Sequence, residues 1–341
     1  MAAHALSFDP HPPSSPSPVP EKSAHPDRMP VAHELVFLDS YRSDRDDLRA
    51  LYEKAKDLNW NARTQFKWDT FVDPESELIP DAFNPIFGSD VWRRLDPKRE
   101  VPLLRRHMTS YVLSNFLHGE QGALLATSQI VACSPTAEAK YYAAAQVFDE
   151  ARHVEVYERY ISEKVGLLYP PSPPLKTLLD TIMTDSRWDF KYLGMQILVE
   201  GVALGAFGMI HETTQEPLIR EITKMIMQDE ARHVAFGVMS LRHAYDDMKA
   251  SELKDREEFI VESSRLLRER FLAQEVWQNV GLPQQECEEL AARSPMMALF
   301  RKLLFSKIVP NVKRLGLLTP TVRKGFEELD VLEYEDWEPS A

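Results

Sequence analysis

The chain has 341 residues, enough for one large domain or two small ones. Its 53 Asp and Glu residues outnumber 40 Lys and Arg residues, and the formal net charge of −13 argues against nucleic acid or an anionic membrane as a partner. Only 12 glycines and a helical period in the apolar residues indicate an all-α protein.

Residues 1–33 are rich in proline, serine and alanine. Such a composition buries too little apolar surface to fold, so we predict a disordered N-terminus. The sequence suggests no apolar run of the roughly 20 residues that span a bilayer, and no signal peptide. Cys133 and Cys287 lack the spacing of a metal site, so we expect a cytoplasmic protein with reduced thiols.

The apolar period predicts helices throughout the rest of the chain. A helical domain is expected over 34–330, and an acidic aromatic tail over 331–341. The predicted helices are 44–58, then four core helices at 98–133, 136–166, 186–213 and 217–247, then 251–280, 296–314 and 319–328 covering one side. An aromatic-rich loop at 60–80 and a proline-rich crossover at 167–185 connect them, so the core bundle is 98–247.

The hexapeptide Asp-Glu-Ala-Arg-His-Val occurs twice, at Asp149–Val154 and Asp229–Val234. Each copy places a Glu and a His three residues apart, so both point to the same side of a helix. Two such pairs, with one Glu from each of two further helices, form the ligand set of a two-metal site inside a four-helix bundle. The members of the pairs are Glu150 with His153 and Glu230 with His233.

The other two glutamates are predicted from hairpin geometry, because residues equally far from a turn lie at the same height. Ser134-Pro135 marks the first turn as an N-cap followed by a first helical proline, and Thr213–Pro217 marks the second. In each hairpin, the two glutamates at about the same distance from the turn are 30 positions apart in the sequence. They are Glu120 and Glu150 in the first hairpin, and Glu200 and Glu230 in the second. Both lone glutamates lie on apolar stripes, where an unpaired carboxylate is costly, which favours metal binding over a solvent-exposed position.

Over 98–247 these motifs resemble the ferritin-like carboxylate-bridged di-iron superfamily, which includes ribonucleotide reductase small subunits, acyl-carrier-protein desaturases, multicomponent hydroxylases and arylamine N-oxygenases. The resemblance implies a four-helix bundle, with additional N- and C-terminal helices, that holds two iron ions. Manganese can replace iron at one position, because carboxylate and imidazole ligands suit both metals. By motif, one metal would be held by Glu120, Glu150 and His153, and the other by Glu200, Glu230 and His233.

The resemblance also implies partners for the two imidazoles. A metal-bound histidine donates its second N–H to a carboxylate, and in similar proteins the aspartate before each motif glutamate accepts it from the opposite pair. The implied contacts are Asp229 with His153 and Asp149 with His233, the aspartates being held by Arg152 and Arg232. Ordinary ion pairs on each helix are the alternative interpretation of these charged residues.

Tyr157 follows His153 by one helical turn, as the radical tyrosine does in ribonucleotide reductase small subunits. It is therefore a candidate catalytic residue, and a tyrosine packed in the core is the alternative. Small residues beside Glu120 and Glu200 allow either a substrate pocket or close helix packing. Phe207 and Thr127 are candidate walls of such a pocket.

The main functional interpretation is an enzyme that activates O2 to oxidise a small organic substrate by hydroxylation, N-oxygenation or desaturation. A radical-generating ribonucleotide reductase subunit and a non-enzymatic iron store are the alternatives. The sequence has no flavin, nicotinamide or iron–sulfur motif, so electrons are expected from a separate ferredoxin or reductase. We also expect a homodimer.

Overall fold

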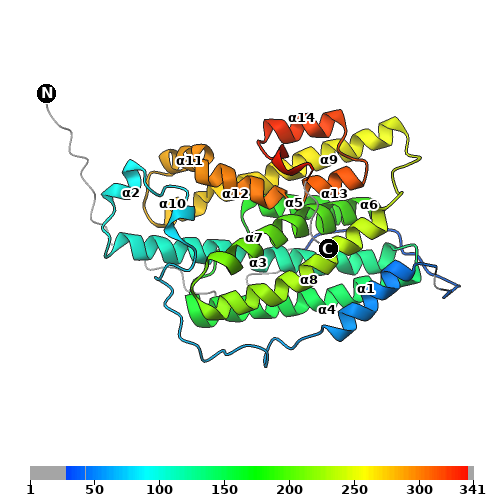
Figure 1. The fold of residues 1–341 in the computed structure, drawn as a ribbon, viewed down its shortest axis with the longest axis horizontal. Helices are drawn as coiled ribbons and strands as arrows, with labels where there is room; N and C mark the ends of the chain where they lie inside the picture. The colour runs from blue at the N-terminus through cyan, green and yellow to red at the C-terminus, as the bar shows by residue number, and fades with distance from the viewer. Residues whose placement is uncertain (1–27, 43, 337–341) are drawn as a thin grey trace.

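The computed structural model describes residues 28–42 and 44–336, and these contain helices but no β-strand. Their centre is a bundle of four long helical segments (Figure 1). These segments contain α3 (Glu100–Cys133), α4 (Ala137–Tyr160), α7 (Glu200–Thr213) and α8 (Pro217–Leu241). The predicted all-α, ferritin-like architecture is therefore confirmed.

Two of the long segments contain π-helical turns. α4 continues through η2 (Ile161–Val165), and α7 is preceded without a break by α6 (Trp188–Tyr192) and η3 (Leu193–Val199). A π-helical turn carries an extra residue and is often found at functional sites, because it changes which side chains face the core. Here η3 ends directly before Glu200, so it sets the direction in which that carboxylate points.

The remaining helices cover the bundle from two sides. α1 (Asp46–Asp57) packs on α4 and α8, whereas the C-terminal helices lie across the opposite side, as Figure 1 shows. The covering helices are α5 (Pro173–Thr184), α9 (Ala250–Glu269), α10 (Gln274–Asn279), α11 (Gln284–Arg293), α12 (Pro295–Phe305), α13 (Val309–Arg314) and α14 (Pro320–Glu328). Short turns complete the fold: η1 (Asp81–Phe83), α2 (Asp90–Arg94), η4 (Arg270–Leu272) and η5 (Leu332–Tyr334).

Several predicted boundaries are wrong. The crossover at 167–185 contains α5, since its prolines occupy the first turn of a helix, where no backbone donor is lost. The helix predicted at 217–247 ends at Leu241, and those at 251–280 and 296–314 are each divided by a short break. α2 and α11 are not predicted, because helices this short show little apolar period.

Both hairpin turns exist, but other residues cap the helices. Thr136, not Ser134, accepts the backbone N–H of Ala139 at the start of α4. Ser134 instead ends α3, and its hydroxyl bonds the Tyr192 hydroxyl at 2.8 Å. At the start of α8 the carboxylate of Glu216 caps the first turn in place of a threonine. Both hairpins still form as predicted. The pairing of residues across each hairpin depends on where the turn lies and not on which residue caps the helix.

One helix among the described residues, Trp188–Thr213, is long and apolar enough to cross a membrane by length and composition. The prediction that no apolar run has this length is therefore wrong. Of its most apolar window, 72% is buried inside the protein, which is the position of a central core helix. Its composition thus follows from contact with neighbouring helices on all sides.

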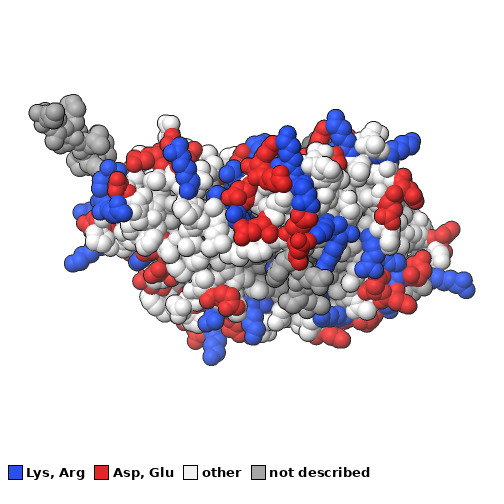
Figure 2. All heavy atoms as spheres, turned by 45° about the horizontal axis from the view of Figure 1, so that its top comes forward, with Lys and Arg blue, Asp and Glu red and all other residues white. Residues whose placement is uncertain are grey.

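Charged side chains of both signs are mixed over the face seen in Figure 2. Near the C-terminus, Glu335 pairs with Arg323 and Lys313, so the described part of the acidic tail contacts its own chain. The predicted N-terminal segment lies outside the described residues as far as residue 27, and so does the tail from residue 337. The predicted domain division at 33 and 331 stays a prediction.

Gly122 and Gly205, which lie close to the core glutamates along α3 and α7, serve helix packing. A Cβ added at Gly122 would lie 2.4 Å from Leu179, and one at Gly205 would lie 3.0 Å from the backbone of Leu304 on α12. The pocket interpretation is therefore wrong for Gly122 and Gly205, whereas Ala206 on α7 lines an apolar cavity. Absence of a side chain lets the covering helices approach the bundle closely.

Gly205→Ala is expected to lower the free energy of unfolding by about 1–3 kcal/mol, because its new methyl group meets backbone that cannot rotate away. Denaturant titration of the purified protein measures the change. Gly119→Ala is the matched control, since nothing lies within 4 Å of its added Cβ, and it should raise helix stability by about 0.5–1 kcal/mol. Equal effects of the two substitutions would contradict the packing explanation.

Candidate metal centre

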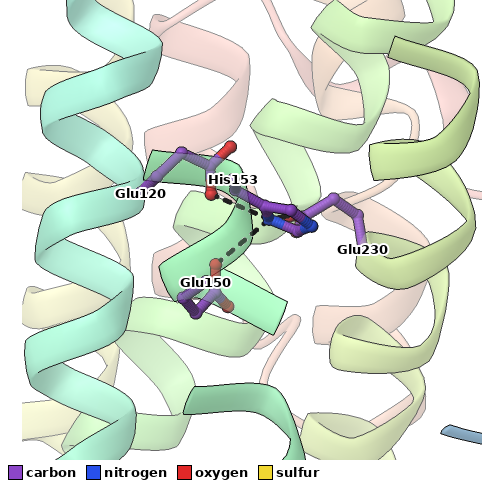
Figure 3. Close-up of side chains that lie close together, drawn as sticks. All are labelled: Glu120, Glu150, His153 and Glu230. Carbon is purple, nitrogen blue, oxygen red and sulfur yellow. Dashed lines mark hydrogen bonds and ion pairs between the residues drawn. The ribbon is translucent and has the colours of Figure 1, made fainter. Parts of the chain in front are cut away.

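Four glutamates and two histidines meet in the interior of the bundle. α3 contributes Glu120, α4 contributes Glu150 and His153, and Glu230 projects from α8 toward them (Figure 3). Ligand atoms of these four residues lie within 4.8 Å of one another, and those of Glu150, Glu200 and His233 form an adjoining group. None of the six side chains is more than 5% exposed.

The glutamates of the two hexapeptides lie between the imidazoles. Glu150 places one oxygen 3.4 Å from His153 Nδ1 and the other 3.2 Å from His233 Nδ1. Glu230 does the same at 3.2 and 3.4 Å. Glu120 and Glu200 approach one imidazole each, at 3.3 Å from His153 and 3.9 Å from His233. Two central and two peripheral carboxylates are thus arranged around two adjacent positions.

Both imidazoles point Nδ1 inward and Nε2 toward an aspartate. His153 Nε2 lies 3.1 Å from Asp229, and His233 Nε2 lies 3.3 Å from Asp149. A proton on Nε2 is then donated to the aspartate, which leaves the Nδ1 lone pair free to bind a metal. Burial acts to raise the pKa of Asp229, but the hydrogen bond to His153 together with the charges of His153, Arg232 and His233 lowers it to about 2.

Arg152 and Arg232 hold these aspartates. Each guanidinium bonds the aspartate of its own hexapeptide closely and lies 3.2 or 3.6 Å from the other one. All four side chains are at most 4% exposed, so the alternative of exposed ion pairs does not describe them. The two hexapeptides therefore form one cross-linked layer behind the imidazoles.

Trp60 is not among the residues that the sequence predicts for this centre. Its indole N–H donates to Asp229 Oδ2 at 2.8 Å, and its ring stacks on His153 with centroids 6.1 Å apart. Arg152 also donates to the Trp60 carbonyl and to Asn59. The sequence places Trp60 in an aromatic loop more than 90 positions away, and only the tertiary fold brings it to the histidine.

Gln146 is a second residue that the sequence does not predict. Its amide N–H groups donate to Glu150 at 2.9 Å and to Glu200 at 3.3 Å. It precedes Glu150 by one helical turn on α4, and this spacing is the signal from which it could be found. The amide ties a central carboxylate to a peripheral one.

The donor atoms at the centre fit a pair of bound cations. Among the described residues, both Glu230 carboxylate oxygens, Glu150 Oε2 and His233 Nδ1 are buried without a hydrogen-bond partner. Unsatisfied buried polar atoms are costly and rare, and the four that converge on one point here are donor atoms that bound cations would satisfy. Carboxylate oxygens and imidazole nitrogens suit iron or manganese.

The electrostatics of the centre agree with this fit. Burial raises the pKa of Glu120 to about 8 and the pKa of Glu200 well above its usual range. Burial acts in the opposite direction on His153 and His233, but the surrounding carboxylates raise both pKa values well above 6.5. Several carboxylates this close together stabilise positive charge that is placed among them.

Tyr157 lies beside the centre within an aromatic cluster. Its ring contacts Phe116 and Phe207 with centroids 5.8 and 6.0 Å apart, and Phe116 and Phe207 meet at 4.7 Å. Its hydroxyl is buried and has no hydrogen-bond partner among the described residues. Burial, and then the charge of Glu120, raise the pKa of this hydroxyl well above 10.

An apolar cavity of about 100 Å³ is lined in part by Phe116, which lies one helical turn before Glu120 on α3. A water needs roughly 10–15 Å³ of such space, so the cavity can hold a small organic molecule. Phe116 and Ala206 line it from α3 and α7. The predicted walls Phe207 and Thr127 do not: Phe207 packs behind Phe116, and Thr127 is buried elsewhere along α3.

Fold and site together define a ferritin-like helical protein whose core can hold two adjacent metal ions between carboxylates and histidines. A family model described as P-aminobenzoate N-oxygenase AurF matches residues 42–316. The chain belongs to this family. It is therefore an O2-dependent oxidoreductase of the di-iron oxygenase type.

Solved structures with the same fold are R2-like ligand-binding oxidases. One variant with an aerobically reconstituted Mn/Fe cofactor has a TM-score of 0.52 at 16% identity, covering 82% of this chain and 99% of that one. A second variant, reconstituted anaerobically, has a TM-score of 0.50 at 18% identity, covering 80% and 94%. The structure of the oxidase after photoconversion has a TM-score of 0.50 at 16% identity, covering 82% of this chain and 99% of that one. No curated protein sequence matches the chain.

Trp60→Phe is expected to weaken metal binding at the position next to His153 by about 10- to 100-fold, because it removes the donor that orients Asp229. Metal titration of the metal-free protein measures this affinity. Trp68→Phe is the control, since its indole donates to the carbonyl of Ala62, away from the centre. Unchanged affinity in the Trp60 variant would show that Asp229 is oriented without it.

Proposed function

We propose that Glu120, Glu150, His153, Glu200, Glu230 and His233 hold two iron ions, or one manganese and one iron, and that the protein inserts oxygen from O2 into an amine. The observation that carries this proposal is the convergence of unpartnered buried carboxylate and imidazole atoms at one point. The family description favours N-oxygenation over hydroxylation or desaturation. Metal ions bound there supply the reduction of O2.

The chain's own residues prepare the site for this chemistry. Glu150 and Glu230 lie between the two positions, so they can hold the metals at a fixed separation. Asp149 and Asp229 keep the imidazoles oriented, with Nδ1 facing inward. The surrounding helices exclude water, which strengthens every electrostatic interaction inside.

The substrate is proposed to occupy the apolar cavity, with its reacting nitrogen toward Phe116 and the metal centre. Balanced for one oxygen insertion, R–NH2, O2, two electrons and two protons give R–NHOH and water. The two electrons are proposed to come from a separate ferredoxin or flavin-dependent reductase. The homodimer and the cytoplasmic location stay predictions.

The function is tested with iron-loaded protein, a ferredoxin–reductase pair, aniline-type amines and ¹⁸O2. Wild type is expected to bind two metal ions per chain and to release an N-hydroxy product carrying one ¹⁸O. Glu120→Ala should lose metal and product formation, because it removes one carboxylate from the centre. The readouts are metal analysis and mass spectrometry.

Glu155→Ala is the matched control, since Glu155 lies on the same helix as Glu150 but is exposed. It should keep both metals and full activity. Product labelled from water would contradict oxygen insertion from O2, and turnover without an added reductant would contradict the separate electron donor. Unchanged metal content in Glu120→Ala would remove this residue from the proposed ligand set.

We propose that Tyr157 acts at the edge of the centre as a redox-active tyrosine, because its buried hydroxyl has no partner and lies near Glu120. After aerobic iron loading, wild type should show a tyrosyl signal by electron paramagnetic resonance. Tyr157→Phe should abolish the signal while binding the same amount of metal. A signal that persists in the variant, or its absence from wild type, would leave Tyr157 with a packing role.

A further inference from the structure

The metal centre lies between two chemically different ends of the bundle. Toward the α7–α8 turn it meets the aromatic cluster of Tyr157, Phe116 and Phe207. The segment of α6, η3 and α7 begins at the other end, beside the α3–α4 turn, as the bond of 2.8 Å between Tyr192 on α6 and Ser134 shows (Figure 1). Because α4 also begins there, residues that precede the core glutamates on α4 and α7 lie toward this second end.

Two buried glutamines occupy the first turn on this side of the centre. Gln146 precedes Glu150 and Gln196 precedes Glu200, each by four residues, and both glutamines are fully buried. Gln146 donates to both carboxylates. Its Oε1 and both amide atoms of Gln196 have no hydrogen-bond partner among the described residues. A buried amide without partners is costly, and these are atoms that bound water would satisfy.

Tyrosine hydroxyls continue the polar groups toward the α3–α4 turn. Tyr142 precedes Gln146 by one helical turn, and its buried hydroxyl also has no partner in the described part of the chain. The rings of Tyr142 and Tyr192 both contact Phe236 of α8, with centroids 4.5 and 5.2 Å apart. Burial raises the pKa of both tyrosines, so each remains a neutral hydroxyl that can accept one hydrogen bond and donate another.

These hydroxyls lie close to the protein surface at the end of α8. Ser240 follows Phe236 by one turn, approaches the Tyr192 hydroxyl and is half-buried. Arg45, whose side chain is 30% exposed, donates to the carbonyl of the preceding residue, Met239, at 2.9 Å. Polar groups therefore extend from the surface beside α8 to the carboxylates of the centre.

We propose that this polar side of the bundle is the route by which protons reach the centre, through water held between Gln146, Gln196 and the hydroxyls of Tyr142 and Tyr192. The inference rests on the proposed function, in which R–NH2, O2, two electrons and two protons give R–NHOH and water. A proton that joins the outer end of a chain of hydroxyls and water releases another at its inner end, so the chain itself is unchanged.

The two glutamines are positioning residues in this route. Their amides hold water in place, and the water and the tyrosine hydroxyls carry the proton. The apolar cavity lies on the aromatic side, where Phe116 forms part of its wall. Protons and the amine thus approach the centre from different sides, and water is kept away from the amine.

The test compares Gln196→Leu, Tyr142→Phe and Tyr192→Phe with wild type, all as metal-loaded full-length protein. In a single turnover of reduced protein with O2 and aniline, each variant should consume O2 at least about 10-fold more slowly, because positioned proton transfer contributes at least this factor. The solvent isotope effect in D2O should increase, since proton transfer then limits the rate. Metal content and aniline affinity should not change, because none of these residues lines the cavity or the predicted ligand set.

Tyr160→Phe is the matched control. Tyr160 is another fully buried tyrosine of α4, but its hydroxyl donates to Glu216 at 2.8 Å, near the opposite turn. This variant should keep the wild-type rate and isotope effect. If Gln196→Leu does not fold, the two tyrosine variants, which each remove a single oxygen atom, carry the test.

A second measurement does not depend on turnover. A high-resolution crystal structure of the metal-loaded wild type should show ordered water bonded to the Gln196 amide, and the structure of Gln196→Leu should lack it. Absence of this water, wild-type rates in the variants, or slower variants with an unchanged isotope effect would overturn the proposal.

The outcome is separable from that of the proposed function. Ordered water at Gln196 and slower, proton-limited O2 consumption in the variants, without an N-hydroxy product from any amine, would support the route and count against N-oxygenation. Formation of the N-hydroxy product at the wild-type rate in all three variants would do the reverse.

Discussion

The protein depends on the burial of four carboxylates at one point in a helical bundle. Glu120, Glu150, Glu200 and Glu230 are each at most 5% exposed, and several of their oxygens have no hydrogen-bond partner among the described residues. Such a group of like charges is unfavourable in a dry interior unless cations compensate it. In the proposed function, two adjacent metal ions provide that compensation, and the aspartate–arginine layer keeps the imidazoles oriented for them.

The two hairpins are similar, but their sequence differences make the two sides of the centre chemically different. Tyr157 follows His153 by four residues, whereas the corresponding position after His233 is Gly237, against which the side chain of Gln196 packs. Gln146 precedes Glu150 by four residues, whereas Ile226 holds that place before Glu230. One side of the centre is therefore aromatic and faces the cavity, and the other is lined by amides.

The cavity connects this chemistry to a choice of substrate. Phe116 belongs both to the aromatic cluster around Tyr157 and to the cavity wall, so a molecule bound there lies on the aromatic side of the centre.

The sequence by itself determined the helical class, the two hairpins and the six residues that meet at their centre, because helix period and equal distances from a turn are local properties. The family resemblance, and not the residue pattern alone, placed Asp149, Asp229, Arg152 and Arg232 beside the imidazoles. Helix ends, caps and the short covering helices were less predictable, since weak local signals are overridden by packing. Only the tertiary structure decided that Trp60 reaches Asp229 and that Gly122 and Gly205 admit the covering helices. These contacts join residues that are distant in the chain, and the apolar periodicity of the sequence carries no information about such contacts.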